Sequence, residues 1–333
     1  MHCSVGFSPI HRWSCLSAAV LFVAAGITAG AVTAQVVPVS APVSAAPQFA
    51  PGVLTTIEPD VDAEDTFAVH DVVELRADAT LAREPNLNTK SRTLYDMSQE
   101  VVFRRDVWCL ELSFKPLRMV YVDIPQPTGK MQRKLVWYLV YRVRNTGVVI
   151  GPEQQDDGSY LTVSVAPGPR RFIPQFALAS QDLDRQGNRV RKEYLDRLVP
   201  AAMPVIRRRE FSGGELFSSV EMAERMLQPE SGRMQDGLWG VAIWEDVDPE
   251  IDFLSVYVGG LTNAYRWEDA KDFQASDPPG KGRMFLRKTL QLNFWRPGDS
   301  LAENEREIRY GAALGEADAY GTSEGVAYRW VYR

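Results

Sequence analysis

The sequence predicts a mainly β protein, built as an antiparallel sandwich or barrel. From about Val101 onward, apolar and polar residues alternate with a period of two, which is typical of strands that bury one face. These segments are short and are separated by clusters of Gly, Pro, Asn and Asp. Helical periodicity is scarce, so only a few short helices are expected.

The clearest strand lies in "KLVWYLVYRVRNTG", residues 134–147. One face of this strand carries only large apolar residues, namely Leu135, Trp137, Leu139, Tyr141 and Val143. The opposite face becomes cationic at Arg142 and Arg144, so the apolar face is expected to point into the core. Asn-Thr-Gly at 145–147 supplies turn-forming residues that end the strand.

The remaining elements follow from the same patterns. Two stretches have helical spacing, 189–198 and 215–226. Trp108, Trp137 and Trp239 share strand faces with Leu and Val and are expected in the core. Further strands are expected at 107–114, 160–165, 171–179, 238–245, 253–258, 289–295 and 328–332.

The first hundred residues lack this strand pattern and divide into three parts. Residues 1–34 combine a weakly basic start, an uncharged apolar run and a small Val-Thr-Ala ending, which is the pattern of a cleaved secretory signal peptide. An uncleaved anchor helix is the alternative, because the 19 residues from Leu16 to Ala34 can just span a bilayer. Residues 35–60 form a Pro- and Ala-rich linker, and 61–100 form an irregular N-terminal segment.

Three successive stretches carry a family resemblance: "WYLVYRVRNTG", "FALASQDLDRQGN" and "MLQPESGRMQDGLWGVAIWEDVDPEIDFLSVYVGGL". Their turns, with Asn-Thr-Gly after a strand, Asp and Gly in a hairpin and an acidic loop after a Gly-aliphatic strand, resemble telokin-like immunoglobulin-fold domains of bacterial envelope proteins. Ser231-Gly232 departs from the family, which prefers Gly directly after the position of Pro229-Glu230. The resemblance implies an immunoglobulin-like β-sandwich at 101–262. Residues 263–333 lie outside the resemblance and are expected to form a β-rich C-terminal extension packed on the sandwich. The whole chain is also similar to secreted bacterial proteins of uncharacterised function.

The composition restricts the chemistry. With 37 Lys and Arg against 43 Asp and Glu, the formal net charge is -6, which argues against nucleic acid as a partner. The basic run at 207–209 is expected to be a solvated face. Without residues 1–34 the chain keeps one cysteine, Cys109, and one histidine, His70, so no disulfide, no Cys/His zinc site and no cofactor are expected. Cys109 is expected to be a packing residue of its strand.

Two acidic stretches have spacings that suit calcium. In "DLDRQGNRVRKE", Asp182, Asp184 and Glu193 fall at ligand positions of a calcium loop, but four basic side chains in the loop favour a plain β-turn at 186–188. In "EDVDPEID", an extended chain would place four carboxylates on one face, and an exposed loop or a glycosidase pair are the alternatives. The calcium candidates are Asp246, Asp248, Glu250 and Asp252.

Two tryptophans are the candidates for a binding surface. Trp244 lies on the strand face opposite Ile243, and Trp295 on the face opposite Phe294. If those apolar faces point inward, both indoles point outward, where they can stack on sugars or anchor a protein. The alternative is that both pack under the C-terminal extension.

These observations predict a non-catalytic exported protein, periplasmic or extracellular, with a structural or protein-binding role in the cell envelope. An envelope protein or a glycan is the expected partner, and a membrane is expected only if residues 1–34 stay uncleaved. Two alternatives remain open: a glycan-binding accessory module that uses outward-facing Trp, and a hydrolase with an unrecognised carboxylate site.

Overall fold

The computed structural model describes residues 54–69, 102–184, 186–190, 192–210, 214–230, 237–272, 281–296, 308–313, 315, 317–321 and 325–333, all of which belong to one compact unit, Ala46–Arg333. The predicted signal peptide at 1–34 lies outside these residues, as does His70. Among the described residues, no helix is both long and apolar enough to cross a membrane.

The first sheet is antiparallel and centres on β7 (Met131–Arg144), which contains the clearest strand of the sequence. One edge of β7 pairs with β12 (Leu238–Glu245). The other edge pairs with β6 (Arg118–Pro125) and then with β5 (Glu111–Phe114). A short strand, β1 (Thr55–Ile57), adds to β5.

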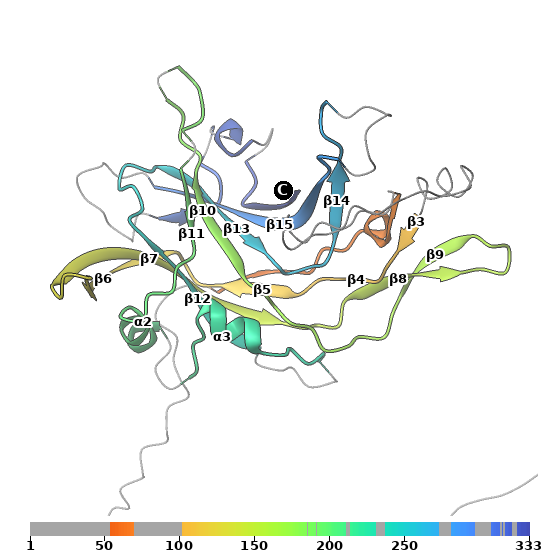
Figure 1. Ribbon diagram of the computed structural model, residues 1–333, viewed down its shortest axis with the longest axis horizontal. Helices are drawn as coiled ribbons and strands as arrows, with labels where there is room; N and C mark the ends of the chain where they lie inside the picture. The colour runs from red at the N-terminus through yellow and green to blue at the C-terminus, as the bar shows by residue number, and fades with distance from the viewer. Residues whose placement is uncertain are drawn as a thin grey trace, which may run out of the picture. The chain divides into compact units, whose positions relative to one another are not determined.

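The second sheet is also antiparallel and lies over the first (Figure 1). Its long strand β15 pairs with β13 on one edge and with β17 on the other. Its members are β11 (Glu193–Leu195), β10 (Gln175–Ser180), β13 (Phe253–Gly259), β15 (Met284–Trp295), β14 (Tyr265–Glu268), β16 (Arg309–Tyr310) and β17 (Tyr328–Tyr332).

The mainly β, antiparallel fold class is thus confirmed, but the predicted C-terminal boundary is wrong. We expected residues 263–333 to pack as an extension on a finished sandwich. Instead β15 and β17 are members of the second sheet, and Leu290, Leu292 and Phe294 lie in the core that both sheets share. Without β15, the edge of β13 would be left unpaired. The immunoglobulin-like topology stays a prediction.

The N-terminal boundaries are also wrong where the structure describes them. The end of the predicted linker at 35–60 forms strand β1, and the start of the predicted irregular segment at 61–100 forms η1 (Ala63–Thr66) and β2 (Phe67–Val69). These elements are three or four residues long. Such lengths are too short for a period to be visible in the sequence, and pairing with distant strands sets their conformation.

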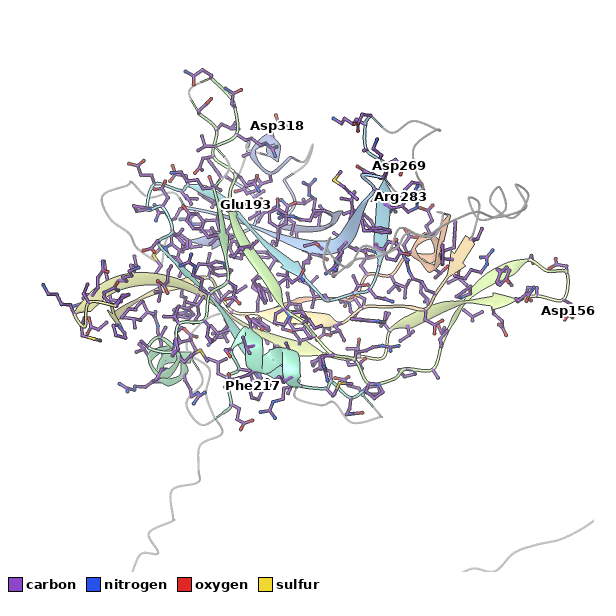
Figure 2. All side chains as sticks on the ribbon, viewed as in Figure 1. Asp156, Glu193, Phe217, Asp269, Arg283 and Asp318 are labelled. Carbon is purple, nitrogen blue, oxygen red and sulfur yellow. The ribbon has the colours of Figure 1, made fainter. Side chains whose placement is uncertain are left out.

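Two smaller sheets complete the β structure. β2 pairs with β3 (Val102–Arg104), and β4 (Val107–Trp108) pairs with the hairpin of β8 (Val149–Gln154) and β9 (Tyr160–Ser164). Figure 1 shows this hairpin extending away from the two main sheets. At the far end of the second sheet, the Arg283 guanidinium pairs with Asp269 at 2.8 Å and joins the ends of β14 and β15 (Figure 2).

The helices agree with the sequence in one case of two. The predicted helix at 215–226 contains α3 (Ser219–Glu224), which Ser218 begins with a capping box. The predicted helix at 189–198 is wrong, because its middle forms β11 in pairing with β10. A helix that was not predicted, α2 (Met203–Glu210), covers the first sheet. A short 3-10 helix, η4, lies at Ala317–Tyr320.

The core has two parts, one on each face of β7. Between the sheets lies the first part, to which β7 contributes Trp137, Leu139 and Tyr141. On the other face, Tyr138 and Val140 lie in a second cluster together with residues of β12 and α2. The predicted faces of this strand are therefore correct, but both are buried, and the expectation of a single core face is wrong.

Candidate functional site

The four carboxylates of the predicted calcium face do not converge. Asp246 has a φ of 56°, in the left-handed region, so the chain turns there and the extended geometry is lost. Its carboxylate bonds to Lys134 at 3.1 Å, whereas Asp248 pairs with Lys192. Among the described residues, no group of three or more His, Cys, Asp or Glu side chains is placed to hold a metal ion. The prediction of a shared carboxylate face is wrong.

The other acidic stretch is the predicted hairpin turn. The carboxylate of Asp184 accepts the backbone N–H of Asn188 at 2.8 Å, and Gly187 has a φ of +81°. Asp182 accepts the N–H of Phe253 at 2.8 Å and so ties this hairpin to the start of β13. The turn at 186–188 is confirmed, and its carboxylates are used by backbone donors.

Of the two candidate tryptophans, only Trp295 keeps an accessible edge. Trp244 is fully buried between the sheets, beside Trp137, its partner across β12 and β7. The outward prediction for Trp244 is wrong because the opposite face, with Ile243, is itself covered by the second core cluster. Trp295 is half-buried, and the Arg309 guanidinium lies 4.9 Å from its ring centre.

Cys109 and the basic run of α2 behave as expected. Cys109 is 1 % exposed, and burial raises the pKa of its thiol to about 12, so it packs as a protonated side chain. Arg207 and Arg208 are exposed, while Arg209 donates to the Met119 carbonyl at 3.0 Å. Two of the three cations of the run thus form a solvated face.

A serine-nucleophile pattern that the sequence prediction overlooked, G-x-S-x-G, occurs at 321–325. The pattern requires a strand before it and a helix after it. Here η4 precedes it and β17 follows it, which is the reverse order. Residues 322–324 lie outside the described part of the chain.

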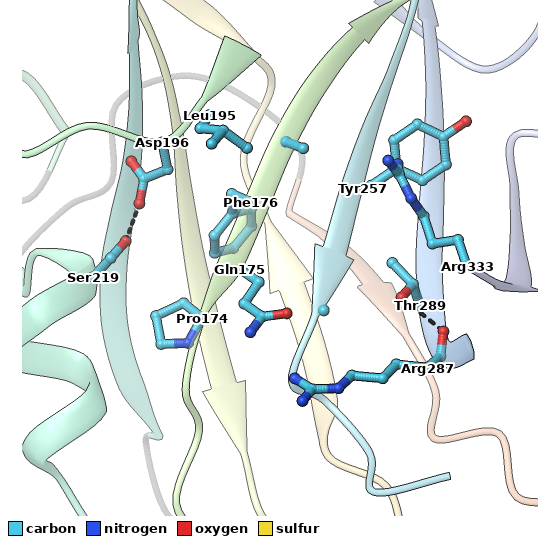
Figure 3. Close-up of a pocket in the computed structure, with 12 residues that line it drawn as sticks. Pro174, Gln175, Phe176, Leu195, Asp196, Ser219, Tyr257, Arg287, Thr289 and Arg333 are labelled. Atoms are coloured by element: carbon cyan, nitrogen blue, oxygen red, sulfur yellow. Dashed lines mark hydrogen bonds between the residues drawn. The ribbon is translucent and has the colours of Figure 1, made fainter. Parts of the chain in front are cut away.

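A groove of about 480 Å³ crosses the outer face of the second sheet and is the best candidate for a site (Figure 3). Alternate residues of β10 and β13, such as Phe176 and Val258, enter the core. Their neighbours Gln175, Ala177 and Gly259 face outward and line the groove. Ala177 and Gly259 fill little space, so the floor of the groove lies low between larger side chains.

One end of the groove is cationic. The Arg333 guanidinium lies 4.1 Å from the ring centre of Tyr257 and pairs with Glu193 at 3.2 Å. The Arg287 side chain extends toward the amide of Gln175 (Figure 3). Within the part of the chain that the structure describes, no carboxylate pairs with the Arg287 guanidinium. Arg287 is therefore a charge that an anionic ligand can neutralise.

The other end of the groove holds a half-buried acid, Asp196. Asp196 accepts the N–H of Ile243, on the edge of β12, at 2.7 Å, and the Ser219 hydroxyl donates to its second oxygen (Figure 3). Burial raises the pKa of Asp196 to about 6, although these hydrogen bonds oppose the shift. The carboxylate also joins the two sheets, because Asp196 follows β11 and Ile243 belongs to the first sheet.

Exposed aliphatic side chains border this acidic end. A smaller cavity of about 90 Å³ shares Asp196 and Ser219 with the groove. Leu195, Leu198 and Val220 line the two cavities and are 69 %, 58 % and 58 % exposed. The site thus combines a guanidinium that has no carboxylate partner among the described residues with an amide, an aromatic ring and an apolar border. This combination suits recognition of a ligand with a carboxylate and an apolar part.

Sequence reasoning did not find this groove, because its lining comes from segments far apart in the chain. The only local signal was an outward face of small and polar residues, as in "QFALAS", beside an inward apolar face. No protein-family model, no curated protein and no solved structure matches this chain. Its function therefore has to be inferred from the groove and its border.

Proposed function

We propose that the chain is an exported, non-catalytic envelope protein that binds another protein through the groove of the second sheet. The observation that carries the proposal is the apolar border of Leu195, Leu198 and Val220. Contiguous apolar side chains on a surface mark contact sites for other macromolecules, and here they adjoin a groove with specific polar groups. The glycan alternative retains only Trp295 of its two indoles and has less support.

Capture from the envelope fraction, followed by reconstitution with the purified partner, tests the binding role. A double variant, Leu195→Glu with Leu198→Glu, places two charges on the border and is expected to weaken the reconstituted complex at least tenfold. Leu161→Glu is the matched control, since Leu161 is 57 % exposed on β9, in another sheet. Equal affinities for all three proteins would contradict the proposal.

Export is the second component of the proposal and rests on the residue pattern of 1–34. Expression with a C-terminal tag, fractionation and N-terminal sequencing of the product test it. We expect a mature chain that begins near Gln35 in the periplasm or the medium. A product that keeps Met1 and sediments with membranes would show an anchored protein instead.

A further inference from the structure

The charge balance of the groove points to a single anionic group on its ligand. Three charged side chains besides Arg287 reach the groove or its margin. Arg333 is paired with Glu193, and Asp196 is held by the hydrogen bonds of Ser219 and Ile243. The guanidinium of Arg287 is left with no carboxylate among the described residues, and Gln175 lines the same groove. One carboxylate neutralises the positive charge at this end of the groove, whereas a polyanion would place further negative charge near Asp196.

The sheet register gives the length of a ligand that reaches both ends. Leu195 pairs with Ala177, and Ala177 pairs with Tyr257 in the next strand. Tyr257 in turn pairs with Gln291 of β15, so Leu195 and Gln291 are three strand spacings apart, roughly 14 Å. Arg287 lies four residues from Gln291 along β15, roughly 13 Å, so the backbones of Leu195 and Arg287 are roughly 20 Å apart. An extended peptide advances about 3.3 Å per residue, so about six residues cross the groove.

We infer that the bound protein inserts an extended peptide segment that places a carboxylate on Arg287 and an aliphatic side chain against Leu195. This inference rests on the proposed protein-binding function and names the chemistry of the segment. The small residues Ala177 and Gly259 leave room for the peptide backbone between the two contacts. Gln175, Tyr257 and the hydroxyl of Ser219 supply polar groups along the same path.

A phage-displayed library of random heptapeptides, selected on the mature chain, tests the inference without a known partner. The expected result is enrichment of peptides that carry Asp or Glu about six positions from Leu, Ile or Val. Enrichment of peptides without an acidic residue would overturn the inference. If sodium alginate displaces the selected peptides from the protein but acidic peptides do not, the groove is a glycan site, and the inference is overturned as well.

Variants then assign the contacts, with one selected peptide labelled with fluorescein as the probe. Arg287→Gln is expected to weaken binding at least tenfold, and Ala177→Leu, which fills the floor, to weaken it similarly. Arg208→Gln is the matched control, because Arg208 is an exposed cation on α2, over the other sheet. Replacing the acid of the peptide with its amide should weaken binding to the wild-type protein but not further to Arg287→Gln.

The two proposals fail in different ways. If the Leu195→Glu, Leu198→Glu protein loses the natural partner while Arg287→Gln keeps full affinity for it, protein binding stands and the carboxylate contact is overturned. If neither variant loses the partner, both proposals are overturned. Thermal unfolding of each variant shows whether the fold is intact, and Arg287→Lys, which keeps the charge, should retain part of the affinity.

Discussion

Asp196 illustrates how one side chain can join two sheets. Its oxygens accept the Ile243 N–H and the Ser219 hydroxyl, and the next residue, Arg197, donates its N–H to the Ile243 carbonyl at 2.8 Å. The edge of β12 is thereby covered. Burial nevertheless disfavours the ionised carboxylate more than these hydrogen bonds favour it, so the folded state loses stability as the side chain loses its proton.

Asp196→Asn should therefore gain stability relative to the wild type as the pH rises. The folded-state pKa of about 6 exceeds the ordinary value of 3.8, so the contribution of Asp196 is complete below pH 3.8 and is lost as the pH rises through 6. Two pKa units correspond to about 3 kcal/mol. Urea unfolding at pH 4 and pH 8 should show a relative gain of about this size for Asp196→Asn. Asp184→Asn should show no such gain, because the Asn188 N–H holds the pKa of Asp184 below its ordinary value. Parallel pH profiles for the wild type and Asp196→Asn would contradict the prediction.

Glu210 is a buried acid that connects a helix to a sheet. It is 1 % exposed, its Oε2 lies 2.6 Å from the Lys115 Nζ, and the Tyr138 hydroxyl donates to its Oε1 at 2.8 Å. These contacts attach the end of α2 to the outer face of the first sheet. Removing one charge of such a pair leaves the other buried without compensation.

Glu210→Gln should destabilise the fold by roughly 3–5 kcal/mol, because it removes the carboxylate that lies 2.6 Å from the buried Lys115 ammonium. The double variant Lys115→Met with Glu210→Gln should recover more than half of that loss. Urea unfolding of the wild type, both single variants and the double variant forms the required cycle. A cost below about 1 kcal/mol for Glu210→Gln would show that water reaches this cluster.

At the scale of elements, strand β7 shows what alternation can and cannot predict. Its two faces were assigned correctly, because a period of two depends only on the strand itself. The cover on its second face could not be predicted, since α2 supplies it and the basic run at 207–209 hides the helical periodicity of α2. Trp244 was misplaced for the same reason. The groove depends on register between distant strands, about which local spacing carries no information.

Trp137→Ala and Arg144→Ala test the middle and the C-terminal end of β7. Trp137 is a large aromatic in the shared core, so its loss should cost roughly 3–5 kcal/mol. Arg144 would cost under about 0.5 kcal/mol as a surface residue, but its guanidinium makes two bonds to Glu111, at 2.7 and 2.9 Å. Its loss leaves a nearly buried carboxylate and should cost about 1–3 kcal/mol. Chemical denaturation measures both, and equal small effects would contradict the assigned core.

At the scale of the whole molecule, residues 55–69 bind the second sheet through ion pairs and a hydrogen bond. The Lys288 ammonium, on β15, is 4 % exposed and bonds to the carboxylates of Asp60 at 3.0 Å and Asp65 at 3.3 Å. The Tyr332 hydroxyl, on β17, donates to the other oxygen of Asp65. Because β1 pairs with β5, this same segment also belongs to the first sheet, so it connects the two.

Truncation should separate this role from that of the residues before it. A chain that begins at Ala46 keeps the compact unit and should melt within about 2 °C of the full chain. A chain that begins at residue 70 loses β1 and leaves Lys288 without its carboxylates, and its melting temperature should fall by about 10 °C or more. Scanning calorimetry of the three proteins decides between the two outcomes. A large drop for the first truncation would mean that residues 1–45 contribute to the fold.

The ion pair between Asp65 and Lys288 also bears on when the chain can complete its fold. The two residues are 223 positions apart, and the second sheet needs β15 before β13 has partners on both sides. Contacts of such high sequence separation must close long loops before they stabilise anything, which makes folding slow. Since chains grow from the N-terminus at roughly 5–20 residues per second, the second sheet cannot be completed before β15 is made. For a protein that leaves the cell, as proposed above, such delayed folding keeps the chain unfolded, and so able to pass through a channel, until it has crossed the membrane.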